Sequence, residues 1–245
     1  MTDFGYREVA PEEKTRLVGQ VFSSVADRYD LMNDLMSLGI HRLWKRHFVA
    51  GCGMRRGQRV LDLAGGTGDI AALARRRVGA SGEVVVGDIN RDMLRAGRRR
   101  MDDRGDVAAF EWLQMNAEAL PFADRRFDHV TIAFGLRNVT DKSTALAEMH
   151  RVLKPGGRVH ILEFSHVSPK PVARAYDLWS FQVLPRLGQA VADDRDSYRY
   201  LAESIRRFPK QASLAGMLRE AGFERVGWEN LSAGIAAIHR GARTG

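Results

Sequence analysis

The chain has 245 residues, of which 44% are hydrophobic and 28% are charged, and its formal net charge is +8. This balance is typical of a globular protein with one large α/β domain or two small domains. The single cysteine, Cys52, excludes an internal disulfide and a cysteine-based zinc site. No apolar run reaches the ~18 residues that a membrane span requires.

Arginines gather in short clusters, among them those at residues 55–56, 75–77, 98–100 and 206–207. Acidic residues separate the clusters, and no aromatic residues are interleaved with them. This pattern favours solvated helix faces over an RNA-binding surface, with attraction to an anionic membrane as the alternative. The N-terminus has an early acid and no apolar core, so we expect a cytoplasmic protein that meets the inner face of the membrane from its surface.

In chain order, about fifty residues precede the first predicted strand, and we expect residues 1–55 to form an N-terminal helical cap. Apolar runs of β type then alternate with helical patterns. The strands are expected at residues 59–63, 83–88, 108–114, 127–134 and 158–163, and the helices at 68–78, 91–101 and 142–152. Strands joined by helical crossovers predict a parallel, doubly wound sheet.

The stretch from 166 to 209 is too long for an ordinary connection, so we expect an insertion that forms a lid or an acceptor pocket. A helix at 211–221 follows, and two strands at 225–231 and 235–240 form a terminal hairpin. The sequence therefore predicts a Rossmann-like α/β fold with a mostly parallel, seven-stranded sheet and a C-terminal antiparallel hairpin. No linker is visible, which indicates a single domain over residues 1–245.

The loop after the first strand has the sequence AGGTG, at residues 64–68. Its glycines let the backbone approach a ligand closely, and Gly66-x-Gly68-x-x-Ala71 can be read as a dinucleotide fingerprint. Asp88, at the end of the second strand, would accept hydrogen bonds from ribose hydroxyls in either NAD or S-adenosylmethionine. Neither feature separates the two cofactors.

Three other features do separate them. Asp62 and Asp69 bracket the loop, where they would repel a pyrophosphate but attract an ammonium group. Asn116 and Ala117 follow the third strand, at a suitable place for contacts to an adenine edge. The chain then has a Lys-Pro-Gly-Gly turn before its fifth strand and ends in a hairpin. In these features the sequence resembles the class I S-adenosylmethionine-dependent methyltransferases.

Longer motifs extend the resemblance to one family. Residues 29–44 have the sequence YDLMNDLMSLGIHRLW, and residues 151–165 have the sequence RVLKPGGRVHILEFS. Both resemble the two signatures of the UbiE/MenG family, as do residues 134–139, 196–204 and 233–241. One departure is visible, because Ala133 stands where the family often has a serine. A side-chain contact from this position to the cofactor is therefore not expected, and a contact through the backbone is the alternative.

The resemblance implies S-adenosylmethionine-dependent C-methylation of a polyprenyl hydroquinol ring, either a benzoquinol or demethylmenaquinol, in ubiquinone or menaquinone biosynthesis. It implies a substrate met at the membrane surface, other quinone-biosynthesis proteins as partners, and no metal. Two alternatives stay open. One is a methyltransferase of another small molecule or of RNA, and the other is a non-catalytic module for assembly of the quinone pathway.

We expect the cofactor to contact the glycine loop, the ends of the first two strands and the turn after the third. The predicted cofactor-binding residues are Asp62, Gly66, Thr67, Gly68, Asp88, Asn116 and Ala117. The resemblance places the acceptor beside the fourth strand, the N-terminal segment and the insertion. The predicted substrate-binding residues are Tyr29, Asn33, Asn138, Tyr198 and Tyr200.

The predicted catalytic residues are Arg137, Asp30 and His41. An arginine is not an ordinary base, but its guanidinium group can stabilise the phenolate from which a ring carbon attacks. The alternative is a structural ion pair of Arg137 with Asp141 or Glu163. Asp30, His41 or a water held by them is expected to accept the phenol proton. The alternative for these N-terminal polar residues is that they tie the cap to the core.

Overall fold

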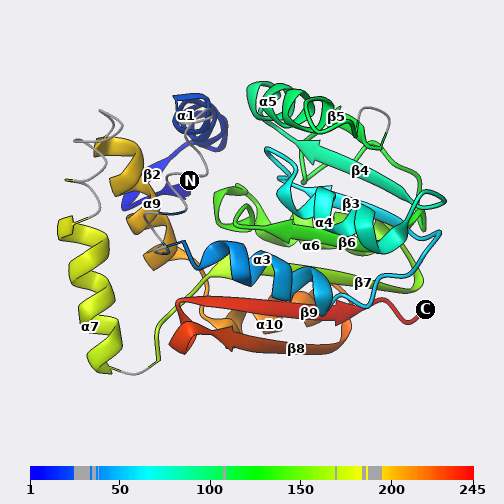
Figure 1. The fold of residues 1–245 in the computed structure, drawn as a ribbon. Coiled ribbons are helices and arrows are strands. Elements are labelled where there is room, and N and C mark those ends of the chain that lie inside the picture. Colours follow the sequence, from blue (N-terminus) through cyan, green and yellow to red (C-terminus); the bar gives the residue numbers. More distant parts are fainter. Residues whose placement is uncertain are drawn as a thin grey trace.

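The computed structural model describes residues 1–24, 34, 37, 39–106, 109–168, 170–183, 186 and 195–245. Its centre is a seven-stranded sheet with the strand order β5-β4-β3-β6-β7-β9-β8 (Figure 1). The strands are β3 (Arg59–Leu63), β4 (Glu83–Asp88), β5 (Glu111–Gln114), β6 (Phe127–Ala133), β7 (Leu153–Phe164), β8 (Glu224–Leu231) and β9 (Ala236–Ala242). Strands β3 to β7 pair in parallel, and β9 pairs antiparallel with both β7 and β8. The predicted mostly parallel sheet with a terminal hairpin is confirmed.

Helices cover both faces of the sheet. The helices are α3 (His41–Ala50), α4 (Asp69–Val78), α5 (Arg91–Asp102), α6 (Lys142–Val152) and α10 (Gln211–Glu220). Val60 and Val86 pack with α3, α4 and α5 on one face, whereas Leu61 and Val85 pack with α6 and α10 on the other. Successive strand residues point to opposite faces, so these buried runs supply two cores, as expected for a doubly wound sheet.

Several element boundaries differ from the sequence prediction, and for two of them the reason is visible. Helix α4 begins at Asp69, one residue later than expected, because Gly68 has a φ of 81° and lies outside the helix. Strand β7 begins at Leu153, five residues earlier than expected, because Leu153 already pairs with Phe127. A register shift then separates this pair from the rest of the ladder.

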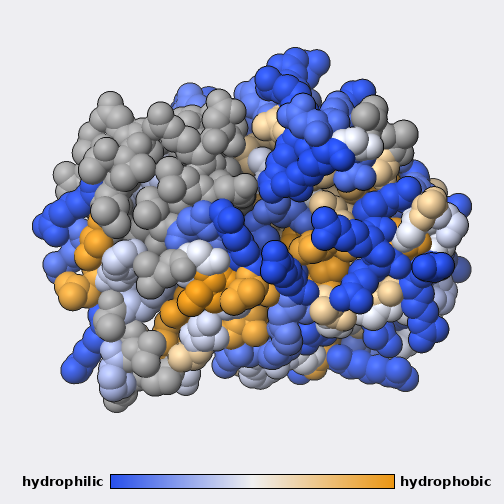
Figure 2. Space-filling model, in the orientation of Figure 1, coloured by the Kyte–Doolittle hydropathy of each residue, from blue (hydrophilic) through white to orange (hydrophobic). Residues whose placement is uncertain are grey.

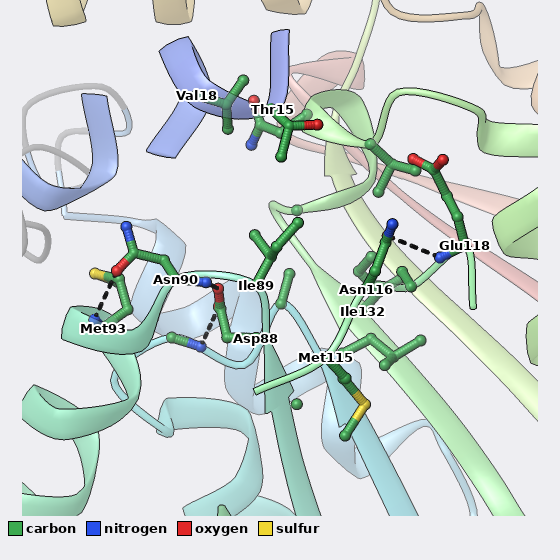
Figure 3. A pocket seen from close by; sticks show the side chains of 18 of the residues that line it. Thr15, Val18, Asp88, Ile89, Asn90, Met93, Met115, Asn116, Glu118 and Ile132 are labelled. Carbon is green, nitrogen blue, oxygen red and sulfur yellow. Dashed lines mark hydrogen bonds between the residues drawn. The ribbon is translucent and has the colours of Figure 1, made fainter. Parts of the chain in front are cut away.

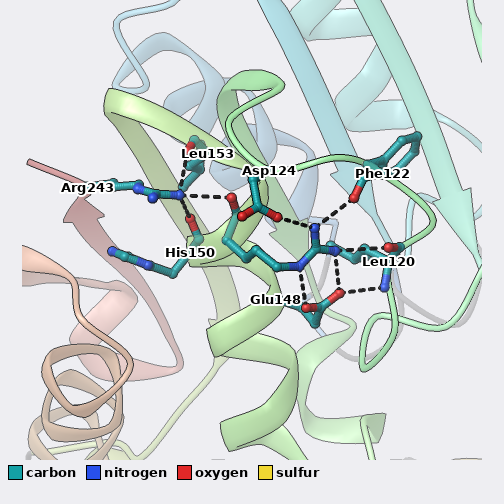
Figure 4. A network of polar contacts seen from close by, with 8 residues as sticks. Leu120, Phe122, Asp124, Glu148, His150, Leu153 and Arg243 are labelled. Atoms are coloured by element: carbon teal, nitrogen blue, oxygen red, sulfur yellow. Dashed lines mark hydrogen bonds and ion pairs between the residues drawn. The ribbon is translucent and has the colours of Figure 1, made fainter. Parts of the chain in front are cut away.

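Arg151 attaches the turn after β5 to α6, and Arg243 binds the C-terminal end of the same helix (Figure 4). Arg151 pairs with Glu148 and Asp124, at 2.6 and 2.8 Å, and donates to the carbonyls of Leu120 and Phe122. Arg243 donates to three carbonyls at the C-terminal end of α6. These bonds satisfy buried carbonyls that the helix end and the turn leave open. The loop that carries Asn116 and Ala117 is thereby attached to the core.

The N-terminal segment contains a small hairpin besides its helices. Strands β1 (Thr2–Phe4) and β2 (Arg7–Val9) pair antiparallel and precede α1 (Pro11–Ser24). The hairpin packs on α9 (Arg195–Arg207), where the rings of Phe4 and Tyr200 stack with their centroids 4.2 Å apart. The described part of the insertion also contains α7 (Lys170–Leu178), a π-helical turn (Trp179–Val183) and α9. The chain's first residues and the insertion therefore form one layer beside the sheet (Figure 1).

Among the described residues, no helix is both long enough and apolar enough to cross a membrane.

Candidate active site

A cavity opens at the carboxyl ends of β3, β4, β5 and β6, where ligands bind in open parallel sheets (Figure 3). Asp88 and Asn90 line it from the end of β4, Asn116 from the turn after β5, and Ile132 from β6. Thr15 and Val18 of α1 lie across the cavity from these strand ends. The predicted cofactor residues Gly66, Asp88, Asn116 and Ala117 all belong to this wall, so residues far apart in the chain are brought together as expected.

Asp88 organises the first half of the wall. Its Oδ2 accepts a hydrogen bond from the backbone N–H of Gly66 at 3.0 Å, and its Oδ1 accepts one from Asn90 at 2.8 Å. Burial raises the pKa of this carboxyl to about 6, although these two N–H groups act in the opposite direction. Each oxygen keeps a lone pair that can accept a hydrogen bond from a ligand hydroxyl group. The residue can therefore hold a diol while it fixes the glycine loop.

The glycine loop is built so that the backbone itself forms the wall. A Cβ on Gly65 would lie 2.5 Å from Val86 Cγ1, and one on Gly68 would lie 2.8 Å from the ring of Trp112. Gly66 and Gly68 also have φ values of 52° and 81°, which side chains disfavour. Side chains at Gly65 and Gly68 would therefore collide with Val86 and Trp112, which pack behind the loop. The dense glycine pattern therefore has a steric cause at the site.

Asp62 lies at the base of a second, smaller cavity that shares Ala64, Gly66 and Phe134 with the first. Its Oδ1 accepts a hydrogen bond from the Thr131 hydroxyl at 2.7 Å. Its Oδ2 is buried and has no hydrogen-bond partner among the described residues. Burial raises the pKa of this carboxyl to about 7. A buried acid with an unpartnered oxygen is suited to a cationic group of a ligand.

The other predicted cofactor residues are polar turn residues. Thr67 lines the second cavity, and its hydroxyl accepts a hydrogen bond from Arg100 at 3.3 Å. The side-chain oxygen of Asn116 accepts the backbone N–H of Glu118 at 3.0 Å, which forms a local turn. Their contacts with the cofactor stay predictions. The donors, acceptors and close backbone that the structure shows do fit S-adenosylmethionine.

On the acceptor side the structure joins two predicted substrate residues. The Tyr200 hydroxyl donates to Oδ1 of Asn138 at 3.0 Å, and Asn138 lines the larger cavity. Burial raises the pKa of the Tyr200 phenol well above its ordinary value of 10, so the phenol stays a donor. Tyr198 is buried in the same apolar core as Trp44 and Phe164, and it does not line either cavity. Tyr29, Asp30 and Asn33 lie outside the described residues.

Arg137 forms the buried ion pair that was the alternative to its catalytic role. Its guanidinium Nη1 lies 2.8 Å from Glu163 Oε1, with both side chains at most 2% exposed, and also donates to the Phe134 carbonyl. The two residues support the short 3-10 turn Leu136–Asn138, because Glu163 also accepts the backbone N–H of Arg137. Arg137 is not among the residues that line the two cavities. This placement favours positioning of Asn138, and a direct phenolate contact stays a prediction.

His41 lies in a separate charged contact. Its Nε2 is 2.9 Å from Asp34, which also pairs with Arg42 at 2.6 Å. The imidazole is buried and does not line either of the two cavities. Its role as a base stays a prediction. Within the described part of the chain, no group of three or more His, Cys, Asp or Glu residues could hold a metal.

Sequence reasoning missed three features of the site. Helix α1 lines the cofactor cavity, and Asn90 donates to its Gly19 carbonyl at 3.2 Å, although this segment was assigned only to the acceptor. Ala64 and Phe134 have positive φ values of 48° and 56°, so strained backbone ends two neighbouring strands at the cavity. Lys45 of α3 lines the second cavity.

Comparison with known proteins places these features in one family. Residues 8–243 match the model of the ubiE/COQ5 methyltransferase family. The protein of Xanthomonas campestris pv. campestris named ubiquinone/menaquinone biosynthesis C-methyltransferase UbiE is 62% identical over 98% of this chain and 95% of its own length. A protein of the same name from Yersinia pestis is 58% identical over 98% of this chain and 96% of its own length.

The fold is similar to that of solved methyltransferase structures. An S-adenosylmethionine-dependent methyltransferase of Thermotoga maritima superimposes with a TM-score of 0.65 at 19% identity, over 91% of this chain and 98% of that one. This likeness concerns the fold alone. The matches in sequence show that the chain belongs to the ubiE/COQ5 methyltransferase family and is an S-adenosylmethionine-dependent C-methyltransferase.

Proposed function

We propose that the protein methylates a ring carbon of a polyprenyl hydroquinol, a benzoquinol or demethylmenaquinol, in ubiquinone or menaquinone biosynthesis. The observation that carries the proposal is an identity of about 60% with proteins named for this reaction, over 98% of the chain. S-adenosylmethionine supplies the methyl group and leaves as S-adenosylhomocysteine. The residues of the chain must then align the two reactants and stabilise the phenolate.

Alignment follows from the shape of the cavity. Asp88 lies at the end of β4 and Asn116 after β5, whereas Asn138 and Val139 follow β6, and all four residues line the cavity. A nucleoside held by the first pair would direct its sulfonium group toward β6, where the acceptor ring would lie. Fixing two reactants in this way can contribute up to about 7–11 kcal/mol to lowering the barrier.

The side-chain amide of Asn138 is the group that stabilises the phenolate. The Tyr200 hydroxyl occupies the carbonyl oxygen of this side chain, so its NH₂ group is directed elsewhere. Because Asn138 lines the cavity, that NH₂ group can donate to an acceptor oxygen on which negative charge develops. The Arg137–Glu163 pair holds the turn on which Asn138 lies. Asp30 and His41 are retained as candidates for the base that takes the phenol proton.

The polyprenyl tail implies an encounter at the membrane surface. Two large apolar side chains of the insertion, Leu178 and Phe181, are 54% and 37% exposed, which leaves apolar surface for a prenyl tail to contact. Orange apolar residues also show on the face of the molecule that carries α3 (Figure 2). The insertion would accordingly receive the tail, and other quinone-biosynthesis proteins are candidate partners there.

The direct test is methylation of two short-chain quinols, one benzoquinol and one demethylnaphthoquinol, kept reduced with dithionite. Purified protein and S-adenosylmethionine should yield the C-methylated ring and an equal amount of S-adenosylhomocysteine. Asn138→Ala serves as the matched variant and should retain cofactor affinity with reduced turnover. Formation of S-adenosylhomocysteine only when RNA is supplied would overturn the proposal, as would cofactor binding without methylation of either quinol.

A further inference from the structure

Two lysines bind the same carbonyl oxygen at the acceptor side of the larger cavity. Lys14 of α1 donates from its Nζ to the Val139 carbonyl at 3.1 Å, and Lys142 of α6 donates to the same oxygen at 3.0 Å. Val139 directly follows Asn138, and both residues line the cavity, as does Thr15, the neighbour of Lys14 (Figure 3). Two cationic groups therefore meet at the turn that carries Asn138.

This arrangement is costly for Lys14. The residue is 1% exposed, and its other hydrogen bond is to Thr2 Oγ1 at 3.5 Å. Burial, followed by the nearby charge of Lys142, lowers the pKa of the Lys14 ammonium group to about 8. Burial also lowers the pKa of Lys142. A buried cation without an ion-pair partner costs folding free energy, so a purely structural role would be served better by an apolar side chain.

The acids near the two ammonium groups have other partners. Those that act on the lysines electrostatically are Asp3, Glu118, Asp141 and Glu163. Asp3 and Glu163 are paired with arginines, whereas Glu118 and Asp141 accept backbone N–H groups of the turn and of α6. Within the described ranges, none of the four forms an ion pair with either lysine. The Val139 carbonyl is therefore the closest acceptor of each ammonium group.

The choice of lysine at these two positions also carries information. Only six of the 38 basic residues of the chain are lysines, and two of the six bind this one oxygen. An ammonium group is a compact donor that two side chains can direct at a single atom, whereas a planar guanidinium group spreads its donors over a wider front. The pattern indicates that the position of the Val139 carbonyl is what the lysines fix.

We propose that Lys14 and Lys142 are positioning residues of the methyl transfer: they hold the Val139 carbonyl and thereby fix the turn from which Asn138 reaches the acceptor. This inference rests on the proposed function, in which Asn138 donates to the quinol oxygen. The lysines complete a set of bonds on consecutive residues, since Glu163 accepts the Arg137 N–H and Tyr200 binds the Asn138 side chain.

The first experiment replaces the lysines by methionine, which has a similar length and no charge. Lys14→Met should lower kcat about 10-fold, as expected for one hydrogen bond from a charged donor, and should leave cofactor affinity within about twofold. Its melting temperature should stay the same or rise, because a buried cation is removed. Lys142→Met should lose less, since Lys14 keeps the carbonyl. The double variant should lose more than the product of the two single losses.

The pH dependence of the Lys14→Met effect separates the ammonium group from packing. Because the pKa of Lys14 is about 8, the wild-type protein loses this charge as the pH rises through 8. The ratio of wild-type to Lys14→Met turnover should therefore fall toward one between about pH 7 and about pH 9.5. Ionisation of the quinol affects both proteins alike and cancels in the ratio. A ratio that is the same at every pH would overturn the proposal.

Hydrogen exchange tests the hold on the turn without an acceptor. The amides of residues 137–141 should exchange about 10-fold faster in Lys14→Met than in the wild type, while those of α4 stay unchanged. Lys210→Met removes an exposed lysine and should change neither exchange nor turnover. If the wild type methylates no quinol, the proposed function fails, and exchange still decides on the lysines. Unchanged exchange in the double variant, or a parallel fall of turnover and melting temperature in Lys14→Met, would overturn the proposal.

Discussion

The cofactor side and the acceptor side of the site are built in different ways. On the cofactor side, Asp62, Gly66 and Asp88 lie at the ends of adjacent parallel strands, and their contacts run to the backbone or to neighbouring strands. On the acceptor side, Asn138 depends on Tyr200, which is 62 positions away in the sequence, and Lys14 reaches the Val139 carbonyl across 125 positions. The cofactor side is therefore formed by the strand ends of the sheet, whereas the acceptor side is assembled from segments that are far apart in the sequence.

The difference indicates how each half can change. Strand ends keep their positions because the hydrogen-bonded ladder and two apolar cores fix them. The acceptor side instead depends on single side-chain hydrogen bonds between the N-terminal hairpin, α9 and the turn after β6. Substitutions there should alter the acceptor side while the cofactor site persists, provided that the buried Arg137–Glu163 pair stays intact. The following predictions test this separation.

Arg137→Ala should have the largest effect, because it should damage both the cofactor side and the acceptor side of the site. The substitution leaves Glu163 buried without its charged partner, which typically costs about 3–5 kcal/mol of folding free energy. We expect a marked fall in melting temperature, with loss of turnover and of cofactor affinity together. Thermal unfolding, calorimetry and turnover on one preparation provide the measurement.

The double variant Arg137→Met with Glu163→Leu is the control for this experiment. Removing both charges should recover much of the stability, since no unpaired charge is left in the core. If Arg137→Ala instead keeps its stability and cofactor affinity and loses only turnover, the positioning role is wrong and the direct phenolate contact is supported.

Asp88→Ala should damage the cofactor half alone. The carboxylate holds the backbone N–H groups of Gly66 and Asn90, and it faces the cavity. Affinity for S-adenosylmethionine should fall by about 1.5–3 kcal/mol, the value of hydrogen bonds to a charged group. Asp88→Asn should lose less, because one oxygen acceptor remains. Calorimetry on folded protein is the test, and an unchanged dissociation constant would remove Asp88 from the site.

Cofactor affinity should also rise with pH. In the free protein, burial raises the pKa of Asp62 to about 7 and that of Asp88 to about 6, so protons occupy these carboxyls at acid pH. A cationic ligand favours the ionised forms, lowers their pKa and releases protons on binding. Affinity should therefore increase from pH 5.5 to about 7 and then level off, by roughly tenfold for each unit of pKa shift.

Calorimetry in buffers with different ionisation enthalpies measures the protons released. Asp62→Asn should remove the upper part of the pH dependence and leave the part that Asp88 contributes. A flat profile in the wild-type protein would show that neither carboxyl changes its ionisation on binding.

The two halves also differ in how far the sequence could predict them. Gly66, Asp88 and Asn116 follow predicted strands directly, so their approach in space follows from the parallel topology. Lys45 could not be assigned, because it reaches Asp69 through the packing of α3 on α4, which no local pattern records. The strands Thr2–Phe4 and Arg7–Val9 are too short to show an alternating pattern. For Arg137, the sequence offered two partners, and burial against Glu163 decided between them.

Tyr200→Phe should have the smallest effect and should be confined to the acceptor half. The ring keeps its stacking on Phe4, and only the hydroxyl that holds the Asn138 carbonyl oxygen is lost. A neutral hydrogen bond of this kind contributes about 1 kcal/mol, so we expect turnover to fall roughly fivefold as the amide loses its fixed orientation. Affinity for S-adenosylmethionine should stay within twofold, roughly the error of such measurements, because Asp62 and Asp88 are untouched. Tyr6→Phe removes the same hydroxyl from a tyrosine that is 55% exposed, and it should change neither quantity. A parallel loss of cofactor affinity in Tyr200→Phe would show that the two halves are coupled through the turn at Asn138, and the separation drawn above would then fail.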